Sequence, residues 1–125
     1  MSCCSDVMKP IEAASCCTPK DTVASAAKAM KTSSCGCSPV VDNIENLNLV
    51  GVVTGRDICH SVVADDRLAS EVSVAEIMRP AFACCGADDS LEEAKLKLDE
   101  HQVTSLPLVN KAGSCCGTIS SHHIR

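Results

Sequence analysis

One stretch of this sequence occurs twice, and the repetition decides the fold. Residues 8–42 are MKPIEAASCCTPKDTVASAAKAMKTSSCGCSPVVD, and residues 78–110 are MRPAFACCGADDSLEEAKLKLDEHQVTSLPLVN. Each stretch begins with Met, a basic residue and Pro, and continues through an apolar segment to two adjacent cysteines. A polar turn, a helical pattern and a proline-containing strand follow in both. The chain therefore contains two copies of one structural unit.

The helix in each copy is predicted from the spacing of its apolar residues. They recur at intervals of three and four residues, which places them on one face of an α-helix. Asp21 or Thr22 is positioned to cap the first helix, and Asp89 or Ser90 the second. The apolar residues are Val23, Ala26, Ala27 and Met30 in the first copy and Leu91, Ala94 and Leu98 in the second.

Two strands follow each helix, at residues 38–42 and 49–54 in the first copy and at residues 106–110 and 115–120 in the second. The first copy then has a further helix, from Arg56 to about residue 64. Each copy is too small to bury one face of a sheet alone, so the two copies should pack on one another. These elements predict an α/β fold of the α+β type.

The segment between the copies, residues 65–77, is mostly polar but contains Val72, Val74 and Ile77. Apolar residues in such a stretch indicate a segment that crosses and packs on the domain rather than a flexible linker. The two copies then occupy residues 1–64 and 78–125.

Composition excludes several classes of partner. The chain has 125 residues, is 46% apolar and carries a net charge of −5, which indicates one compact domain without attraction to nucleic-acid phosphates or anionic lipids. Phe82 is the only aromatic residue, so no platform exists for stacking single-stranded nucleic acid. No apolar run approaches the length of a membrane span, and the N-terminus has no apolar signal region. We therefore expect a cytoplasmic protein that binds neither nucleic acid nor membranes.

Eleven cysteines are the unusual feature of the composition. An odd number without a signal peptide argues against a secreted disulfide scaffold. The chain has no CxxC, and the CxC at residues 35–37 could hold a soft metal only if further ligands converged on it. We therefore predict no metal ligand. The four histidines, His60, His101, His122 and His123, have no metal-ligand spacing either.

Alignment of the two copies assigns several thiols to the core. Cys115 and Cys116 align with Leu49 and Val50 of the other copy, so they occupy positions of aliphatic residues. A thiol in such a place acts as a small hydrophobic residue. The alternative is a metal-binding or redox-sensing protein that uses the CxC and the adjacent cysteine pairs.

In their order, spacing and duplication, these segments resemble a tandem pair of CBS domains, a Bateman module. The resemblance covers almost the whole chain. It is carried in the first copy by DVMKP, DTVASAAKAM, SPVVD and LVGVVTGRDI, and in the second by EIMRP, DSLEEAKLKL, TSLPLVN and CCGTISSHHI.

The resemblance implies two βαββα repeats related by a pseudo-twofold axis, with residues 65–77 between them. It further implies a regulatory module rather than an enzyme, with no cofactor required for its role. The ligand would be AMP, ADP, ATP, NAD or S-adenosylmethionine, bound between the repeats. A homodimer is expected, and an unidentified target protein would respond to the bound ligand.

The end of LVGVVTGRD carries the implied ribose and phosphate contacts. Asp57 resembles the family's ribose-binding aspartate, and one carboxylate can accept hydrogen bonds from both ribose hydroxyls. Thr54 offers a hydroxyl where the strand ends, Gly55 permits close approach of the backbone, and Arg56 can donate to phosphates. The alternative for Thr54 and Asp57 is an ordinary helix cap.

The family's geometry implies a base pocket shared by both repeats. Phe82 is either packed against the base or an ordinary core residue. The implied pocket residues are Val52, Phe82, Ala83, Thr104, Ser105, Leu106 and Pro107.

A second, degenerate site is implied in the pseudo-symmetric position. His123 stands there in place of the carboxylate, and a neutral imidazole has only one acceptor nitrogen. Protonated, His122 or His123 could hold a phosphate, which would make binding pH-dependent. The chain ends at Arg125, where the final helix of the second repeat is expected to begin. The residues of this second site are Ala14, Ser15, Gly36, Cys37, Ser120, His122 and His123.

The sequence gives no reason to expect catalysis. It contains no GxxxxGK[ST] or GxGxxG motif and no nucleophile, base and orienting group at recognisable spacing. Cys59 and His60 are adjacent on the predicted helix, so their side chains point in different directions.

Overall fold

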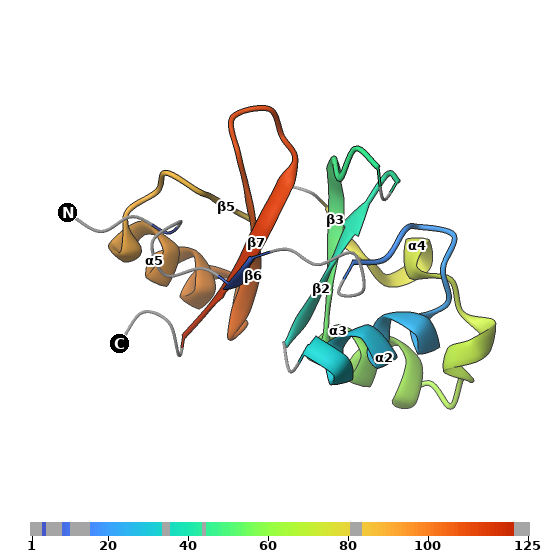
Figure 1. Cartoon of the computed structure of the whole chain (residues 1–125). Coiled ribbons are helices and arrows are strands. Elements are labelled where there is room, and N and C mark those ends of the chain that lie inside the picture. Colours follow the sequence, from blue (N-terminus) through green and yellow to red (C-terminus); the bar gives the residue numbers. More distant parts are fainter. Residues whose placement is uncertain are drawn as a thin grey trace.

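The computed structural model of the chain describes residues 4, 9–10, 16–33, 36–43, 45–80 and 84–121. They form two small sheets that lie side by side, with helices on the outer side of each (Figure 1). One sheet has the strand order β2-β3-β4 and the other the order β1-β7-β6-β5, which confirms the α+β class. The strands are β1 (Lys9–Pro10), β2 (Cys37–Val41), β3 (Leu49–Thr54), β4 (Arg79–Pro80), β5 (Cys85–Gly86), β6 (Ser105–Val109) and β7 (Cys115–Ser120).

The hairpins β2–β3 and β6–β7 have the same register. Cys37 lies opposite Thr54 in the first hairpin, and Ser105 lies opposite Ser120 in the second. Both ladders shift by one residue near the other end, between Val40 and Val41 and between the equivalent residues of β6. A shared irregularity is a stronger sign of common structure than a shared strand length. The predicted internal duplication is confirmed.

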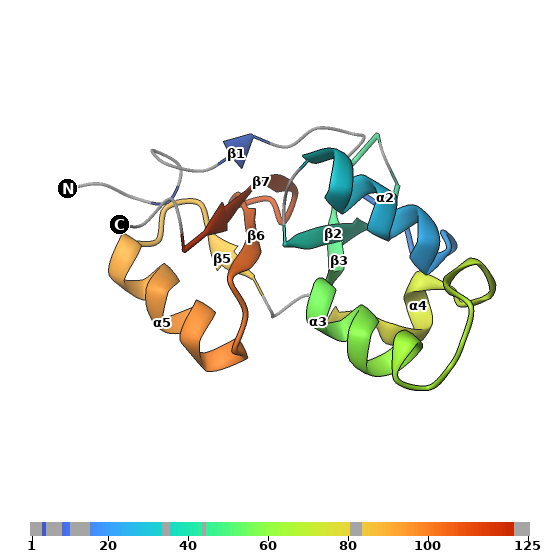
Figure 2. The ribbon, with the colours of Figure 1, turned by 90° about the horizontal axis from the view of Figure 1, so that it is seen from below.

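The short first strand of each copy pairs with the sheet of the other copy. β1 lies beside β7, at the edge of the second sheet (Figure 2), with Pro10 opposite Gly117. β4 lies beside β3 in the first sheet, with Pro80 opposite Gly51. Cys4 is accordingly buried in the core of the second copy. The two copies therefore exchange their leading strands.

The two long helices are α2 (Val23–Ser33) and α5 (Leu91–His101). Thr22 and Ser90 cap them, each by accepting a hydrogen bond from a backbone N–H three residues later, at 3.2 Å in both cases. Their apolar faces cover the outer side of the sheets, and Ala94 and Leu98 are buried there. Hydroxyl residues rather than the neighbouring aspartates are therefore the N-caps.

The other helices in the described ranges are short and lie in the first copy or in the segment that connects the copies. α3 (Gly55–Ile58) continues into a π-helix, η2 (Cys59–Val63), and these two replace the predicted helix that begins at Arg56. A 3-10 turn, η3 (Ala69–Glu71), and α4 (Val74–Ile77) follow. Between them Val72 is buried and accepts a backbone hydrogen bond from Val23 at 2.8 Å. The connecting segment therefore packs on the first copy.

The inner faces of the sheets pack together, mainly β2 against β6. At one end of this interface the hairpin loops are joined through the backbone. Leu49 N donates to Gly113 O at 3.1 Å, and Cys115 N donates to Leu47 O at 2.7 Å. Backbone hydrogen bonds are strong, directional ties, so this end of the interface is fixed in register. Side chains join the other end, where β3 and β7 finish.

Candidate functional site

Thr54 and Asp57 form a capping box at the start of α3. Thr54 Oγ1 accepts a hydrogen bond from Asp57 N at 3.1 Å, and Asp57 Oδ2 accepts one from Thr54 N at 3.0 Å. Thr54 is buried, whereas the Asp57 carboxylate is partly exposed. The helix-cap role considered for this pair is therefore present, and it holds the carboxylate in one orientation.

Arg79 forms an ion pair with Asp57. Its Nε donates to both carboxylate oxygens, at 3.0 Å to Oδ1 and 3.1 Å to Oδ2. Its Nη1 donates to His101 O at 3.0 Å, at the C-terminal end of α5. The Arg79 side chain is 25% exposed and the Asp57 side chain 14%, so water screens this pair less than a surface pair. Arg79 thus ties the first repeat to the second.

Sequence reasoning missed the role of Arg79, although a signal was present. The Met-basic-Pro segments mark the start of each copy, and a basic residue recurs there. What the pattern did not indicate is that β4 pairs with β3 and places Arg79 opposite Val52, close to the end of that strand. The exchange of leading strands brings this basic residue to the acidic one.

The Asp57 carboxylate retains limited capacity for further hydrogen bonds. An ionised carboxylate has about four acceptor positions on its two oxygens. Oδ2 accepts from Thr54 N and from Arg79 Nε, and Oδ1 accepts from Arg79 Nε. Oδ1 can accept one more donor without any rearrangement. A ribose that used both of its hydroxyls would have to share the acceptor positions that Arg79 now occupies.

Arg56 and Gly55 lie beside the ion pair. Arg56 Nη1 donates to Gln102 O at 3.4 Å, which places a second cation beside Arg79 at the end of α5. Gly55 is exposed, and a Cβ added there would meet no atom within 4 Å. The fold therefore does not require glycine at position 55.

The second repeat contributes Thr104 and Ser105. A Cβ built on Gly36 would lie 3.0 Å from Ser105 Oγ and 3.2 Å from Thr104 Oγ1. Gly36 O in turn accepts a hydrogen bond from Gly55 N at 3.2 Å. Ser105 Oγ is buried and makes no hydrogen bond with any residue in the described part of the chain. A buried hydroxyl without a partner is rare and calls for a ligand or water.

The structure does not bring every predicted pocket residue to the group around Asp57 and Ser105. Leu106 is fully buried in the core of its own repeat, packed with residues of α5. Val52 packs against Cys37, and Pro107 is buried within β6. Ser120, predicted for the second site, lies opposite Ser105. Six predicted residues fall outside the described ranges: Ala14, Ser15, Phe82, Ala83, His122 and His123.

The sequence matches the CBS domain family twice, over residues 4–64 and 74–125. The chain belongs to the CBS domain family. Among relatives, a homoserine O-acetyltransferase of Methanococcus vannielii is 29% identical over 83% of this chain and 20% of its own length. The CBS domain-containing protein YhcV of Bacillus subtilis is 33% identical over 75% of this chain and 64% of its own length. The chain thus spans about a fifth of the length of the acetyltransferases it matches.

Solved CBS-pair structures share the fold at low sequence identity. Hypoxic Response Protein I, solved with two coordinated zinc ions, has a TM-score of 0.83 at 22% identity and covers 98% of this chain and 96% of its own. CBSX2 of Arabidopsis thaliana in complex with AMP has a TM-score of 0.76 at 22% identity, with 99% and 93% covered. A CBS domain pair in complex with 5′-methylthioadenosine and S-adenosyl-L-methionine has a TM-score of 0.79 at 21% identity, with 99% and 93% covered.

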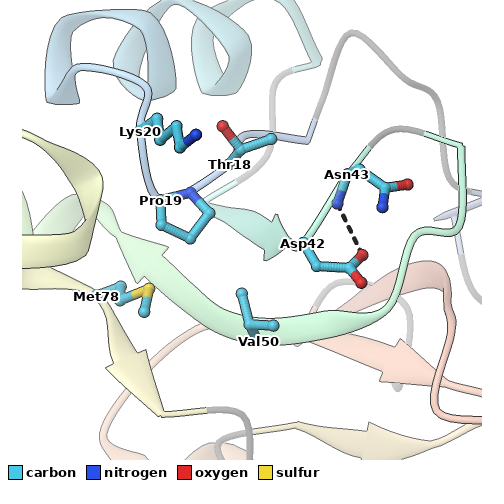
Figure 3. Close-up of a pocket in the computed structure, with 7 residues that line it drawn as sticks. All are labelled: Thr18, Pro19, Lys20, Asp42, Asn43, Val50 and Met78. Atoms are coloured by element: carbon cyan, nitrogen blue, oxygen red, sulfur yellow. Dashed lines mark hydrogen bonds between the residues drawn. The ribbon is translucent and has the colours of Figure 1, made fainter.

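A separate pocket of about 440 Å³ lies at the opposite end of the first CBS repeat (Figure 3). It lies where β2 ends and β3 begins, whereas the Asp57 group lies where β3 ends. The Asp42 carboxylate at its rim is engaged by the backbone N–H groups of Asn43, at 2.7 Å, and Asn48, at 3.2 Å. No motif in the sequence indicated this pocket. Its lining residues are Thr18, Pro19, Lys20, Asp42, Asn43, Val50 and Met78.

The thiols of the two CBS repeats are mostly buried. Burial raises the pKa of Cys17 to about 11 and the pKa values of Cys85 and Cys115 to about 12, which keeps these thiols protonated and unreactive at neutral pH. Within the described ranges, no three His, Cys, Asp or Glu side chains are grouped so that they could hold a metal ion. Nor does any helix in those ranges have the length and apolar character to cross a membrane.

Proposed function

We propose that this CBS pair is a regulatory module, not an enzyme, that binds an adenosine-containing nucleotide where Asp57 meets the second repeat. The observation that carries the proposal is that Asp57 and Arg56 of the first repeat meet Arg79 and the end of α5 of the second repeat. Figure 2 shows α3 and the C-terminal end of α5 on the same side of the molecule. A ligand bound there touches both repeats at once.

Each side chain has a role that follows from its chemistry. Asp57 accepts a hydrogen bond from a ribose hydroxyl, in a charge-assisted contact stronger than one between neutral groups. The capping box holds this carboxylate in place before the ligand arrives, so little ordering is needed on binding. Ser105 Oγ, buried and without a described partner, supplies a hydroxyl from the second repeat. Phe82 and Ala83 remain the proposed wall of the base pocket.

The ligands of similar proteins support the adenosine class. CBSX2 was solved with AMP, and another CBS pair with 5′-methylthioadenosine and S-adenosyl-L-methionine. All three molecules contain an adenosine moiety, and they differ in what is attached to its ribose. AMP, ADP, ATP, NAD and S-adenosylmethionine are therefore the candidates for this chain.

The proposed signal is a change in how the repeats pack. A ligand shifts an equilibrium between two packings only through its different affinity for each. Backbone hydrogen bonds join the two hairpin loops, whereas at the Asp57 end the contacts to α5 come from the side chains of Arg56 and Arg79. The ligand acts on these side-chain contacts. A homodimer mate or a separate target protein would detect the altered packing.

The test is a panel of these five compounds, measured by thermal shift and titration calorimetry. Stabilisation should grow with ligand concentration, as mass action requires. Asp57→Asn should weaken the binding of the best ligand roughly 10- to 100-fold, because hydrogen bonds to a charged group contribute about 1.5–3 kcal/mol. Glu76→Gln is the matched control.

Glu76 occupies the same local arrangement at a distant place. It completes a capping box with Ser73 at the start of α4 and pairs with Arg67 at 3.3 Å, as Asp57 does with Thr54 and Arg79. Glu76→Gln should therefore leave affinity unchanged while removing a comparable cap. Equal losses in the two variants, or no stabilisation by any of the five compounds, would contradict the proposal.

A further inference from the structure

Arg79 is held in place by the backbone on both sides of its side chain. β4 pairs with β3 so closely that a Cβ on Gly51 would lie 2.5 Å from Arg79 O. On the other side, Met78 N donates to Val74 O at 2.9 Å and closes α4. The guanidinium therefore extends from a fixed strand, not from a loose connection between the repeats.

The guanidinium of Arg79 has unused donors. Five N–H bonds are available on an arginine. The Nε hydrogen is taken by Asp57 and one Nη1 hydrogen by His101 O, while no acceptor in the described part of the chain contacts Nη2. A quarter of the side-chain surface is exposed. The contact with Asp57 and the contact with α5 fix the plane in which the remaining donors lie.

The charges around this point favour an anion. Two guanidinium groups, those of Arg56 and Arg79, stand beside one carboxylate, that of Asp57. The C-terminal end of α5 adds about half a negative charge, which both arginines partly satisfy through carbonyls of that helix. Counted over these groups alone, a positive excess remains. A phosphate would be attracted to it, and a cationic sulfonium would be repelled.

We propose that Arg79 determines the specificity of this site and selects a phosphate-bearing adenosine ligand over an uncharged nucleoside and over S-adenosylmethionine. The inference rests on the proposed function and narrows it to nucleotides such as AMP. Arg79 keeps its contact with Asp57, which orients it, and donates through its remaining N–H groups to the phosphate. Asp57 then binds the ribose of the ligand, and Arg79 binds its phosphate.

The experiment compares AMP, adenosine and S-adenosylmethionine by titration calorimetry on the whole chain. The wild type should bind AMP at least tenfold more tightly than the other two compounds. Arg79→Gln should lower the affinity for AMP about tenfold and change the affinity for adenosine less than twofold. Arg79→Lys keeps the positive charge but lacks the planar set of N–H donors, so it should retain part of the preference for AMP.

Arg67→Gln is the control, because Arg67 pairs with the capping carboxylate of α4 as Arg79 pairs with that of α3. It should leave all three affinities unchanged. Adenosine bound as tightly as AMP by the wild type, or equal losses of AMP and adenosine in both Arg79 variants, would overturn this inference alone. Failure of these three compounds and of ADP, ATP and NAD to bind would overturn the proposed function and this inference together.

Discussion

Replacing Gly51 by alanine tests whether a single backbone contact sets the position of β4. The added Cβ would lie 2.5 Å from Arg79 O and 3.0 Å from Met78 Sδ, and ordinary contact begins at about 3.4 Å. Met78 can rotate away because its side chain is flexible, but the carbonyl can move only with the strand. β4 must therefore shift by about 0.9 Å from β3.

The magnitude follows from two opposing effects. Forcing an extra methyl group into a packed place costs about 1–3 kcal/mol. A Gly→Ala change also lowers the conformational entropy of the unfolded chain, which stabilises the folded state by about 0.4–1 kcal/mol. The middle of these two ranges gives a net destabilisation of about 1.3 kcal/mol, which lowers the Tm by about 5 °C in a domain of this size.

Thermal unfolding followed by circular dichroism measures this effect, with Gly55→Ala as the control. A Cβ at position 55 meets no atom within 4 Å, so that variant should keep the wild-type Tm or exceed it slightly. If Gly51→Ala melts within 1 °C of the wild type, the reasoning that this contact positions β4, and through it Arg79, is refuted.

Two further predictions concern the thiols. The pKa values of Cys17 and Cys115 in the folded protein, about 11 and about 12, lie above the value of about 8.5 for a thiol in the unfolded chain. The contribution of these two thiols to the free energy of unfolding is therefore complete below pH 8.5 and falls as the pH rises toward 11. The urea midpoint should drop between pH 8 and pH 10.5, and less steeply in Cys115→Ala; a flat profile in the wild type would contradict this. Cys59 is exposed and Cys85 is buried, so Cys59→Ser should remove one rapidly reacting thiol in an Ellman assay and Cys85→Ser none. A smaller rapid phase in the second variant would show that burial does not protect that thiol.

Much of the fold was predictable because its signals are local. Apolar spacing and hydroxyl caps specify α2 and α5, and the repeated proline-containing strands specify the two hairpins. The adjacency of the copies also followed, because neither could bury its sheet alone. The π-helix after Ile58 was not predicted, since a single extra residue per turn leaves no clear mark on an apolar pattern.

The candidate site was predictable only in part, for a physical reason. Thr54, Gly55, Arg56 and Asp57 are consecutive, and a motif reveals neighbours in sequence. Arg79 reaches them because β4 pairs with β3, and these strands belong to different copies. The spacing of residues within one copy does not indicate which residue of the other copy lies beside them. The carboxylate that seemed available to a sugar is for that reason already engaged by a cation.

The exchange of leading strands makes the two CBS repeats depend on each other. If the chain were cut between η2 and α4, β4 would belong to a different fragment from the rest of the first sheet. Each fragment would then carry an edge strand of the other fragment's sheet. Each half on its own would lack one edge strand of its sheet. We therefore expect the two halves to unfold together, in one transition, and not one after the other.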